Sequence, residues 1–221
     1  YLLLPPPGRN ELTIDRSFTW EAHAFTPVED QAVGAYYTLR NWRADVAELD
    51  VWMVVHDDGP VGHASSWASR AQIGDPVALW GPRTAYHPLD GTDRLLLVAD
   101  ETGLPAVAGV IEALPAGTTA VVVAETGDDS QRQPLPEHPD VQVIWCSRNG
   151  APAGTTSVLV DAVRSLPPLP ATTYIFGGGE SKAMTAVRRY VRDELGFPRE
   201  AVPLNAYWRH RTTTDADDAD S

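Results

Sequence analysis

The sequence carries few basic residues, one cysteine and no long hydrophobic run. Its 221 residues include 17 lysines and arginines against 30 aspartates and glutamates, which gives a net charge of −13. A chain of this charge repels the phosphates of nucleic acid and of anionic membrane surfaces, so we expect no nucleic-acid partner. No apolar stretch approaches the roughly 20 residues that a bilayer span requires, so we expect no membrane insertion.

Cys146 is the single cysteine and lies in the apolar run VQVIWCS. One thiol forms no disulfide within a chain, and in such a run we expect it to be buried and inert. This cysteine usage fits a reducing compartment, and we expect a cytoplasmic protein. The chain opens on YLLLPPPGRNE without an initiator methionine or a signal-peptide pattern. We therefore expect that an upstream segment, with one or more strands, is missing.

Residues 1–91 have the pattern of an antiparallel β structure. Short runs rich in β-branched and aromatic residues, such as ELDVWMVVH and DPVALWGP, alternate with Gly- and Pro-rich turns, and helical periodicity is scarce. The run GAYYTLRNW is interpreted as one strand with Tyr36, Thr38 and Arg40 on one face and Tyr37 on the other. The ordinary interpretation of that run is a sheet with one face exposed to solvent, and the alternative is a face that binds a ligand.

Residues 92–210 alternate buried strands with helices, which is typical of a parallel α/β sheet. The predicted strands are RLLLVAD, TTAVVVAE, VQVIWCS and TYIFGGG, and the predicted helices are GLPAVAGVIEAL, TSVLVDAVRSL and ESKAMTAVRRYVRDELG. Gly196 supplies the stop of the last helix. Residues 211–221 form an acidic tail to which we assign no role. The inward face of the last helix is predicted to consist of Met184, Val187, Val191 and Leu195.

Two polar segments follow predicted strands of this second half. They are ADETG, residues 99–103, and GGGES, residues 177–181. Ligands of parallel α/β sheets bind beyond the carboxyl ends of the strands, where helix N-termini attract anions. The three glycines would let the backbone approach a bulky ligand, but they also suit a tight strand-to-helix turn. Because neither a G-x-G-x-x-G fingerprint nor a P-loop is present, these residues leave a dinucleotide site open without deciding it.

The sequence contains no pattern that indicates a metal site or a nucleophilic side chain. None of the six histidines pairs with another His, Cys or carboxylate at metal-ligand spacing on one element, so we expect no protein metal site. There is no G-x-S-x-G elbow and no histidine context for Cys146, so we expect no covalent catalysis by a side chain.

Seven segments, in order along the chain, resemble the siderophore-interacting protein family of ferric-siderophore reductases, which belongs to the ferredoxin-reductase superfamily. They are YYTLR, the segment ending in HASSWA, GDPVALWGPR, ADETGLPA, CSRNGAPAG, FGGGESKAM and ELGFPREAVPLNAYWR, and they span residue 1 to about residue 209. The resemblance implies a two-domain fold. An N-terminal antiparallel flavin-binding β-barrel, residues 1–91, is followed by a parallel α/β nucleotide-binding, Rossmann-like domain, residues 92–210.

The resemblance also implies that FAD lies across the barrel face. In the family the first segment carries R-x-Y-[ST], so Tyr37 is expected to pack on the flavin and Thr38 to meet its polar edge. Ala35 stands at the arginine position, which removes a charge-assisted contact to the pyrophosphate, and Arg40 is a candidate replacement. The residues that the resemblance assigns to FAD are Tyr37, Thr38, Arg40, His56, Ala64, Ser65, Ser66, Asp100, Glu101, Thr102 and Trp208.

Each of these assignments has a structural alternative. His56 also suits a strand end with a satisfied hydrogen bond, and residues 100–102, where Ala99 replaces the family's glycine, also suit a capped helix start. Trp208 also suits a C-terminal edge strand. The resemblance further implies that Arg209 faces an anionic siderophore.

NADPH or NADH is the electron donor that the resemblance implies. Related reductases hold the adenosine 2′-phosphate near Ser147 and Arg148, which favours NADPH, although Arg148 also suits a solvated loop. The glycine run would form the cradle, with Lys182 as a second cation. The residues assigned to this donor are Ser147, Arg148, Gly178, Gly179, Glu180, Ser181 and Lys182.

The implied function is that of an FAD-dependent ferric-siderophore reductase, which moves electrons from NAD(P)H through flavin to the Fe(III)-siderophore and releases Fe(II). Flavin carries this chemistry, because it joins a two-electron donor to a one-electron acceptor, and no catalytic side chain is assigned. Two alternatives stay open. One is a non-catalytic module that binds ferric chelates. The other is a flavin reductase with another electron acceptor, although the acidic chain disfavours docking to ferredoxin.

Overall fold

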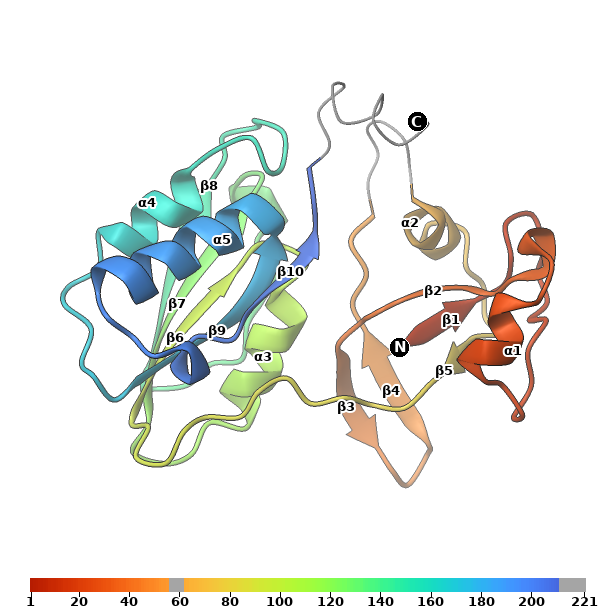
Figure 1. Ribbon diagram of the computed structural model, residues 1–221, viewed down its shortest axis with the longest axis horizontal. Helices are drawn as coiled ribbons and strands as arrows, with labels where there is room; N and C mark the ends of the chain where they lie inside the picture. Colours follow the sequence, from red (N-terminus) through yellow and green to blue (C-terminus); the bar gives the residue numbers. More distant parts are fainter. Residues whose placement is uncertain (56–61, 211–221) are drawn as a thin grey trace. The chain divides into compact units, whose positions relative to one another are not determined.

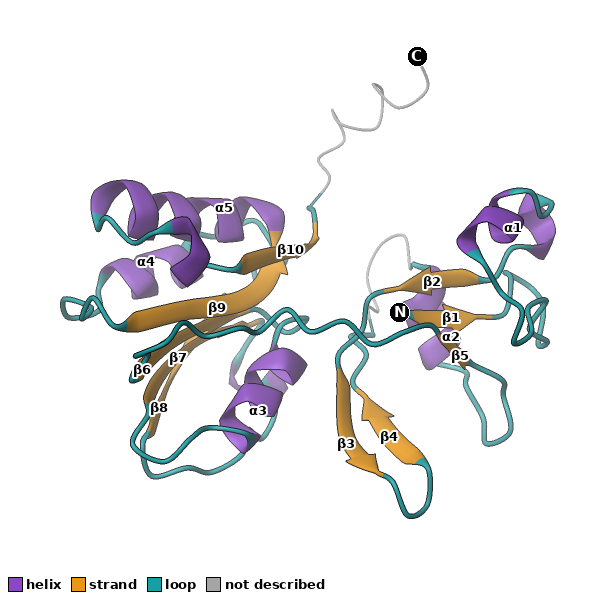
Figure 2. Ribbon diagram, turned by 60° about the horizontal axis from the view of Figure 1, so that its bottom comes forward, coloured by secondary structure: helices purple, strands orange, loops and turns teal. Residues whose placement is uncertain are grey.

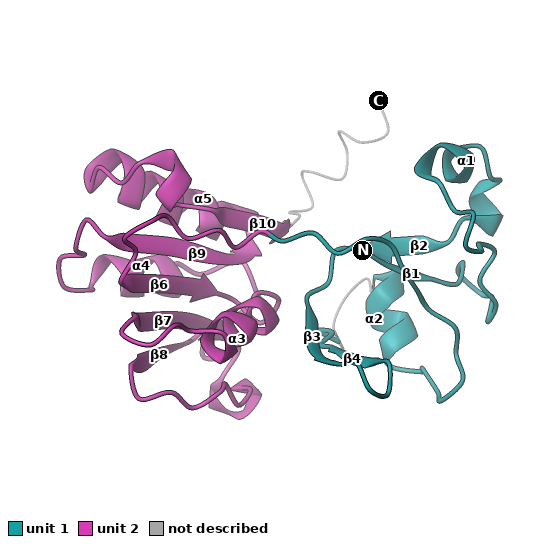
Figure 3. Cartoon of the chain, turned by 90° about the horizontal axis from the view of Figure 1, so that it is seen from below, with its two compact units in different colours: residues 1–84 teal, residues 85–221 magenta. Residues whose placement is uncertain are grey.

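The chain forms two compact units in the computed structural model, residues 1–84 and 85–221 (Figure 3). The structure describes residues 1–55 and 62–210. Figure 1 shows the order of the elements along the chain. An antiparallel β unit followed by a parallel α/β unit is the fold class that the sequence predicts, and that prediction is confirmed.

The first unit holds two small antiparallel sheets within its described residues. One sheet has the order β2-β1-β5 and the other pairs β3 with β4. The unit buries the apolar face of β1, whose three leucines are at most 4% exposed. Two short helices that the sequence pattern did not predict complete the unit. The elements are β1 (Leu2–Leu4), α1 (Trp20–Ala24), β2 (Val33–Ala35), β3 (Leu39–Arg43), β4 (Glu48–Val51), α2 (His63–Ala68) and β5 (Ala78–Leu79).

The run GAYYTLRNW is not one continuous strand, so this prediction was wrong. β2 ends at Ala35 and β3 begins at Leu39, and the residues between them belong to neither strand. The two strands pair in different sheets, β2 with β1 and β3 with β4, so the chain must change direction between them. A register shift follows between Arg40 and Arg43, and Asn41 has φ of 49°. The expected alternation of side chains along the run therefore does not hold.

The second unit is built on a five-stranded parallel sheet of order β10-β9-β6-β7-β8. Four of its strands, β6 to β9, are the runs that the sequence predicted, and β10 is an edge strand of mixed burial. β6, β7 and β9 are mostly buried because helices cover both faces of the sheet. The elements are β6 (Arg94–Ala99), α3 (Leu104–Glu112), β7 (Thr119–Thr126), β8 (Val141–Ser147), α4 (Val158–Arg164), β9 (Thr173–Glu180), α5 (Ser181–Arg189) and β10 (Leu204–Trp208).

Helices cover both faces of this sheet (Figure 2). On one face α4 and α5 close a core with Leu96, Leu159 and Met184 among its buried members. On the other face α3 closes a second core, which includes Leu97 and Val107. No helix in the two described ranges is long and apolar enough to cross a membrane.

The last predicted helix changes its winding before it ends. α5 is followed by a π-helical turn, Tyr190–Glu194, in which Leu195 N donates to Tyr190 O at 3.1 Å. The wider turn shifts the helical phase, so Leu195 is 43% exposed, and its predicted inward position was wrong. Phe197, at 8% exposure, joins the core in its place.

Candidate functional site

The carboxylate of Asp100, directly after β6, joins three strands of the α/β unit. Asp100 is 3% exposed. Its Oδ1 accepts hydrogen bonds from Thr102 N at 2.9 Å and Thr102 Oγ1 at 2.5 Å. Its Oδ2 accepts from Glu180 N at 2.8 Å and from Trp208 Nε1 at 2.7 Å. Burial raises the pKa of Asp100, against the opposing effect of the hydrogen bonds from Thr102 and Trp208. The carboxylate thus ties the ends of β6, β9 and β10 together.

The three glycines of GGGES lie inside β9 and not in a loop after it. Each pairs with β10, and protein atoms occupy the space that a side chain would take. A Cβ on Gly177 would stand 1.8 Å from Val98 O, one on Gly178 would stand 2.5 Å from the Tyr207 ring, and one on Gly179 would stand 2.7 Å from an Asp100 oxygen. The close approach that the glycines allow is therefore an approach between the protein's own strands.

Glu180 caps the N-terminus of α5 with its own carboxylate. Its Oε2 accepts from Lys182 N at 2.5 Å and from Ala183 N at 2.9 Å, and its Oε1 accepts from His210 N at 3.2 Å. Glu180 is 3% exposed, Ser181 is half-buried and the Lys182 side chain is exposed. A carboxylate thus holds the position at this helix end that a bound anion would take.

Arg148, directly after β8, is held by two carboxylates. Its Nη2 and Nη1 donate to both oxygens of Glu101, at 2.7 and 3.1 Å, and Nη1 also donates to Glu125 Oε1 at 3.0 Å. Nε donates to Ala151 O at 3.4 Å. Burial raises the pKa of Glu125, and the nearby Arg148 opposes that rise. The Arg148 side chain is 7% exposed, so a 2′-phosphate at this position would have to displace a carboxylate.

The backbone after β8 brings Arg148 to these acids. Arg148 N donates to Thr126 O at 2.9 Å, and Gly150 N donates to Gly127 O at 3.1 Å, so the turn is bonded to the end of β7. Asn149 and Gly150 both have positive φ, 52° and 80°, which turns the chain back at this point. The ends of β6, β7 and β8 consequently share one cluster of charged side chains.

Glu125 is the member of this cluster that the sequence analysis missed. It lies next to last in β7 and is 6% exposed. A charged residue that closes the apolar run TTAVVVAE is the signal that would have found it, because a buried acid requires a partner.

Three of the residues assigned to flavin, Tyr37, Thr38 and Arg40, lie on and beside β3. Tyr37 is half-buried, and burial raises the pKa of its phenol. Arg40 is 6% exposed, and its guanidinium carbon lies 4.1 Å from the centre of the Trp52 ring. Large aromatic side chains flank this stretch, with Tyr36 65% and Trp42 64% exposed. The FAD assignments to Tyr37, Thr38 and Arg40 stay predictions.

The remaining assigned residues belong partly to the β unit and partly to the α/β unit. Ala64, Ser65 and Ser66 lie in α2, with Ser65 buried and Ser66 exposed, and His56 lies outside the described residues. Ser147 closes β8, and its Oγ donates to Asn149 Oδ1 at 3.2 Å. Trp208 closes the edge strand β10 half-buried, and Arg209 after it is exposed.

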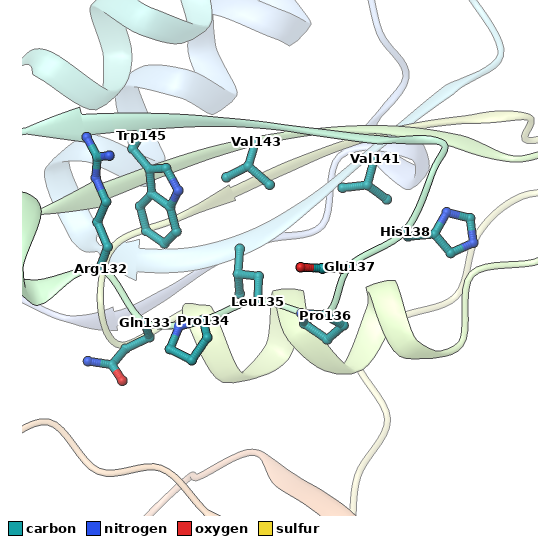
Figure 4. A pocket seen from close by; sticks show the side chains of 10 residues that line it. All are labelled: Arg132, Gln133, Pro134, Leu135, Pro136, Glu137, His138, Val141, Val143 and Trp145. Carbon is teal, nitrogen blue, oxygen red and sulfur yellow. The ribbon is translucent and has the colours of Figure 1, made fainter.

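An open hollow of about 540 Å³ lies between β8 and the segment of residues 132–138 (Figure 4). It contains none of the assigned residues. Trp145 forms part of its wall, and Arg132 lies 5.8 Å from the centre of that ring. Arg132 forms an ion pair with Asp129 at 2.6 Å, so the charge of this arginine already has a partner. Among the residues that the structure describes, no group of three His, Cys, Asp or Glu is placed to hold a metal ion.

The two units define a protein class before any family is considered. A ferredoxin reductase of carbazole 1,9a-dioxygenase superposes with a TM-score of 0.60 at 16% identity, covering 82% of this chain and 56% of that one. A likeness at this identity concerns the fold, and the fold is that of the ferredoxin-reductase-like proteins.

The chain belongs to the siderophore-interacting protein family. A model described as the siderophore-interacting FAD-binding domain matches residues 1–86, and a model described as siderophore-interacting protein matches residues 92–211. The family that the sequence resembles is thereby confirmed.

Several relatives and solved structures match across both units. An uncharacterised protein of Mycobacterium tuberculosis is 32% identical over 211 residues, which cover 91% of this chain and 74% of the relative. The ferric vibriobactin reductase ViuB of Vibrio cholerae is 30% identical over 191 residues, which cover 85% and 69%. Among solved structures, a siderophore utilization protein from T. fusca has a TM-score of 0.76 at 28% identity, covering 96% of this chain and 79% of that one. SipS from Aeromonas hydrophila has a TM-score of 0.73 at 27% identity, covering 95% and 82%.

Proposed function

We propose that this protein is an FAD-dependent ferric-siderophore reductase that takes its electrons from a nicotinamide dinucleotide. The observation that carries the proposal is the match of an FAD-binding domain and a siderophore-interacting domain, in that order, on one chain. A relative named as a ferric vibriobactin reductase, 30% identical over 191 residues, supports it.

The side chains of the β unit suit FAD by their chemistry. Tyr37 offers a phenol, Thr38 and Ser66 offer hydroxyls, and Arg40 offers a guanidinium. All four are hydrogen-bond donors, as the anionic pyrophosphate and the carbonyl edge of a flavin require. In this assignment Tyr37 packs on the ring and Thr38 bonds its polar edge. Arg40 supplies the cation that the family's arginine, here Ala35, would otherwise bring.

Bound flavin would accept two electrons together from NAD(P)H and deliver them one at a time, so that one NAD(P)H and two Fe(III) chelates give NAD(P)⁺, one proton and two Fe(II) chelates. The protein's part is to hold the ring and leave room for a chelate. Siderophore oxygen ligands are hard donors that prefer Fe(III), so reduction makes the iron exchangeable. The iron is substrate, and the protein needs no ligands of its own for it. Arg209, exposed after β10, is proposed to face an anionic chelate.

The proposal is tested with purified protein reconstituted with FAD. We expect a visible flavin spectrum, bleaching on anaerobic addition of a nicotinamide dinucleotide, and recovery of colour on addition of a ferric catecholate or hydroxamate chelate, with Fe(II) trapped by ferrozine. Tyr37→Ala is expected to weaken FAD binding about tenfold or more, since a stacked aromatic contributes about 0.5–1.5 kcal/mol beyond its buried area. Phe18→Ala, which removes an aromatic ring of the same unit outside the assigned site, is the matched control.

The same experiment separates the alternatives. Tight quenching of tryptophan fluorescence by a ferric chelate, without any uptake of flavin, would indicate a binding module. Flavin reduction without transfer to the chelate would indicate a different electron acceptor. A colourless protein that binds neither would refute the proposal.

A further inference from the structure

The carboxyl ends of β6 and β7 decide which adenosine ribose the α/β unit can accept. β6, α3 and β7 form a βαβ unit with parallel strands. In dinucleotide-binding units of this kind, an acidic side chain at the end of the second strand hydrogen-bonds the ribose 2′-hydroxyl, whereas an arginine nearby accommodates a 2′-phosphate. Glu125 is the next-to-last residue of the second strand here, and the neighbouring cation is Arg148.

Arg148 has little capacity left for a phosphate. A guanidinium carries five N–H donors. Four of them are used, two by the bidentate pair with Glu101, one by Glu125 and one by Ala151 O. The Arg148 and Glu125 side chains are each 7% exposed, so a phosphate would have to displace a buried carboxylate and leave it without its partner.

The charge of the cluster also disfavours a 2′-phosphate. Glu101 and Glu125 together outweigh the single positive charge of Arg148, and the buried carboxylate of Asp100 lies on the same sheet edge. A dianionic phosphate gains nothing from such a surface. A ribose hydroxyl can donate to a carboxylate oxygen, and Glu101, whose side chain is 20% exposed, offers one at the rim.

Lys182 does not make up for the cation. It follows β9, and the strand order places β6 and β7 between β9 and β8. The backbones of the two residues are therefore about three inter-strand spacings apart, or about 14 Å, and the strand ends that carry Asp100, Glu101 and Glu125 lie between them.

We infer that this edge takes NADH in preference to NADPH, with Glu101 binding the 2′-hydroxyl of the adenosine ribose and Arg148 acting as a positioning residue clamped between Glu101 and Glu125. The inference rests on the proposed function, since it names the electron donor of that reductase. It replaces the 2′-phosphate contact that the resemblance implied for Arg148 and the flavin contact that it implied for Glu101.

Two readouts on the FAD-loaded protein test it. The first is the ratio of kcat/KM for NADH over NADPH with a ferric chelate as acceptor, which we expect to be about tenfold or more, as for a lost charge-assisted contact. The second is equilibrium binding of 5′-ADP against adenosine 2′,5′-bisphosphate by calorimetry, with flavin already bound so that its own adenine site is filled. We expect 5′-ADP to bind more tightly.

Glu101→Gln is the informative variant, because its side chain reaches the rim and its loss frees donors of Arg148. We expect the donor ratio to fall about tenfold, with weaker NADH binding and stronger bisphosphate binding. Glu194→Gln is the matched control. Glu194 also forms a bidentate pair with an arginine, Arg164, at 2.5 and 2.9 Å, on an exposed surface away from this cluster. It should leave both ratios unchanged.

Other outcomes overturn the inference. A wild-type preference for NADPH, equal binding of the two adenosine phosphates, or an equal loss with both donors in Glu101→Gln would each do so. The failure of the proposed function has a different signature, namely no flavin uptake, or no Fe(II) from protein reduced with dithionite. Where flavin is bound but no Fe(II) forms, the calorimetric comparison of wild type and Glu101→Gln still decides the ribose selectivity.

Discussion

Replacing Gly177 by alanine is the sharpest test of why β9 carries three glycines. A Cβ at this position would stand 1.8 Å from Val98 O and 2.8 Å from the Val98 carbonyl carbon. Both are backbone atoms of β6, the central strand of the sheet, so no side chain can rotate away to make room. Gly177 pairs with Val98 on one side and with Leu204 on the other, so any shift of β9 disturbs two ladders.

The expected cost of Gly177→Ala follows from that geometry. The 1.8 Å separation has to grow to about 3.0 Å, the shortest distance that real Cβ atoms show, so the strands must part locally by about an ångström. Overpacking of a dense core costs about 1–3 kcal/mol, and each weakened backbone hydrogen bond adds about 1 kcal/mol. We therefore expect a loss of about 3–5 kcal/mol in the free energy of unfolding, a large share of the total for most domains.

Urea unfolding followed by far-ultraviolet circular dichroism measures this loss, with the transition of the α/β unit fitted separately if two transitions appear. Gly109→Ala, in the interior of α3, is the matched control, because the new Cβ would meet nothing within 4 Å beyond its chain neighbours and the backbone of its own helix. It should stabilise the protein by about 0.5–1 kcal/mol, because alanine is the better helix former. If Gly177→Ala unfolds like the wild type and only weakens binding of a nicotinamide dinucleotide, the glycine serves a ligand and the packing argument is refuted.

Three further measurements probe the rest of the unit. Glu125→Gln should flatten the dependence of stability on pH. Burial raises the pKa of Glu125, so the folded state keeps this proton to a higher pH than the unfolded state does, and the wild type loses stability as the pH rises from the ordinary glutamate range through the raised pKa. Paired unfolding curves at several pH values should show this slope in the wild type and not in the variant. Burial also raises the pKa of the Cys146 thiol, so the folded protein should react slowly with Ellman's reagent at pH 8 and fully after unfolding, and fast reaction of the folded form would contradict its buried position. Phe197→Ala should lower the free energy of unfolding in urea by about 3 kcal/mol or more, and Leu195→Ala by less than about 0.5 kcal/mol, because Phe197 is buried and Leu195 is exposed after the π-helical turn. The reverse order would indicate a regular α-helix there.

Local patterns predicted the elements of the α/β unit well. The run RLLLVAD is a strand buried from Leu95 to Ala99, and its continuous apolar centre predicts a strand that is covered on both faces. VQVIWCS is also a strand as predicted, although this edge strand is only partly buried. The positive φ of Gly196 after the last helix agrees with the predicted stop signal. The seven ordered segments resemble a family that the comparisons confirm.

Prediction failed where the outcome depends on partners that are distant in sequence. Tyr36 and Thr38 have good strand propensity, but their run is interrupted because β2 and β3 join different sheets. The apolar pattern of the sequence keeps the period of a regular α-helix through Leu195 and so gives no sign of the π-helical turn. That turn depends on how the following chain, with Phe197, packs into the core.

The amino-acid order alone determined that a β unit precedes a parallel α/β unit, because hydrophobic periodicity and turn residues act over a few neighbouring positions. It also placed acidic, glycine and arginine residues after the strands. Which of these meet one another was settled by folding, since Trp208 reaches Asp100 from 108 positions away and Arg148 reaches Glu101 from 47. A buried charge finds its partner through strand order and register, and for that reason an arginine that looks free for a phosphate in the sequence is held by two carboxylates in the folded protein.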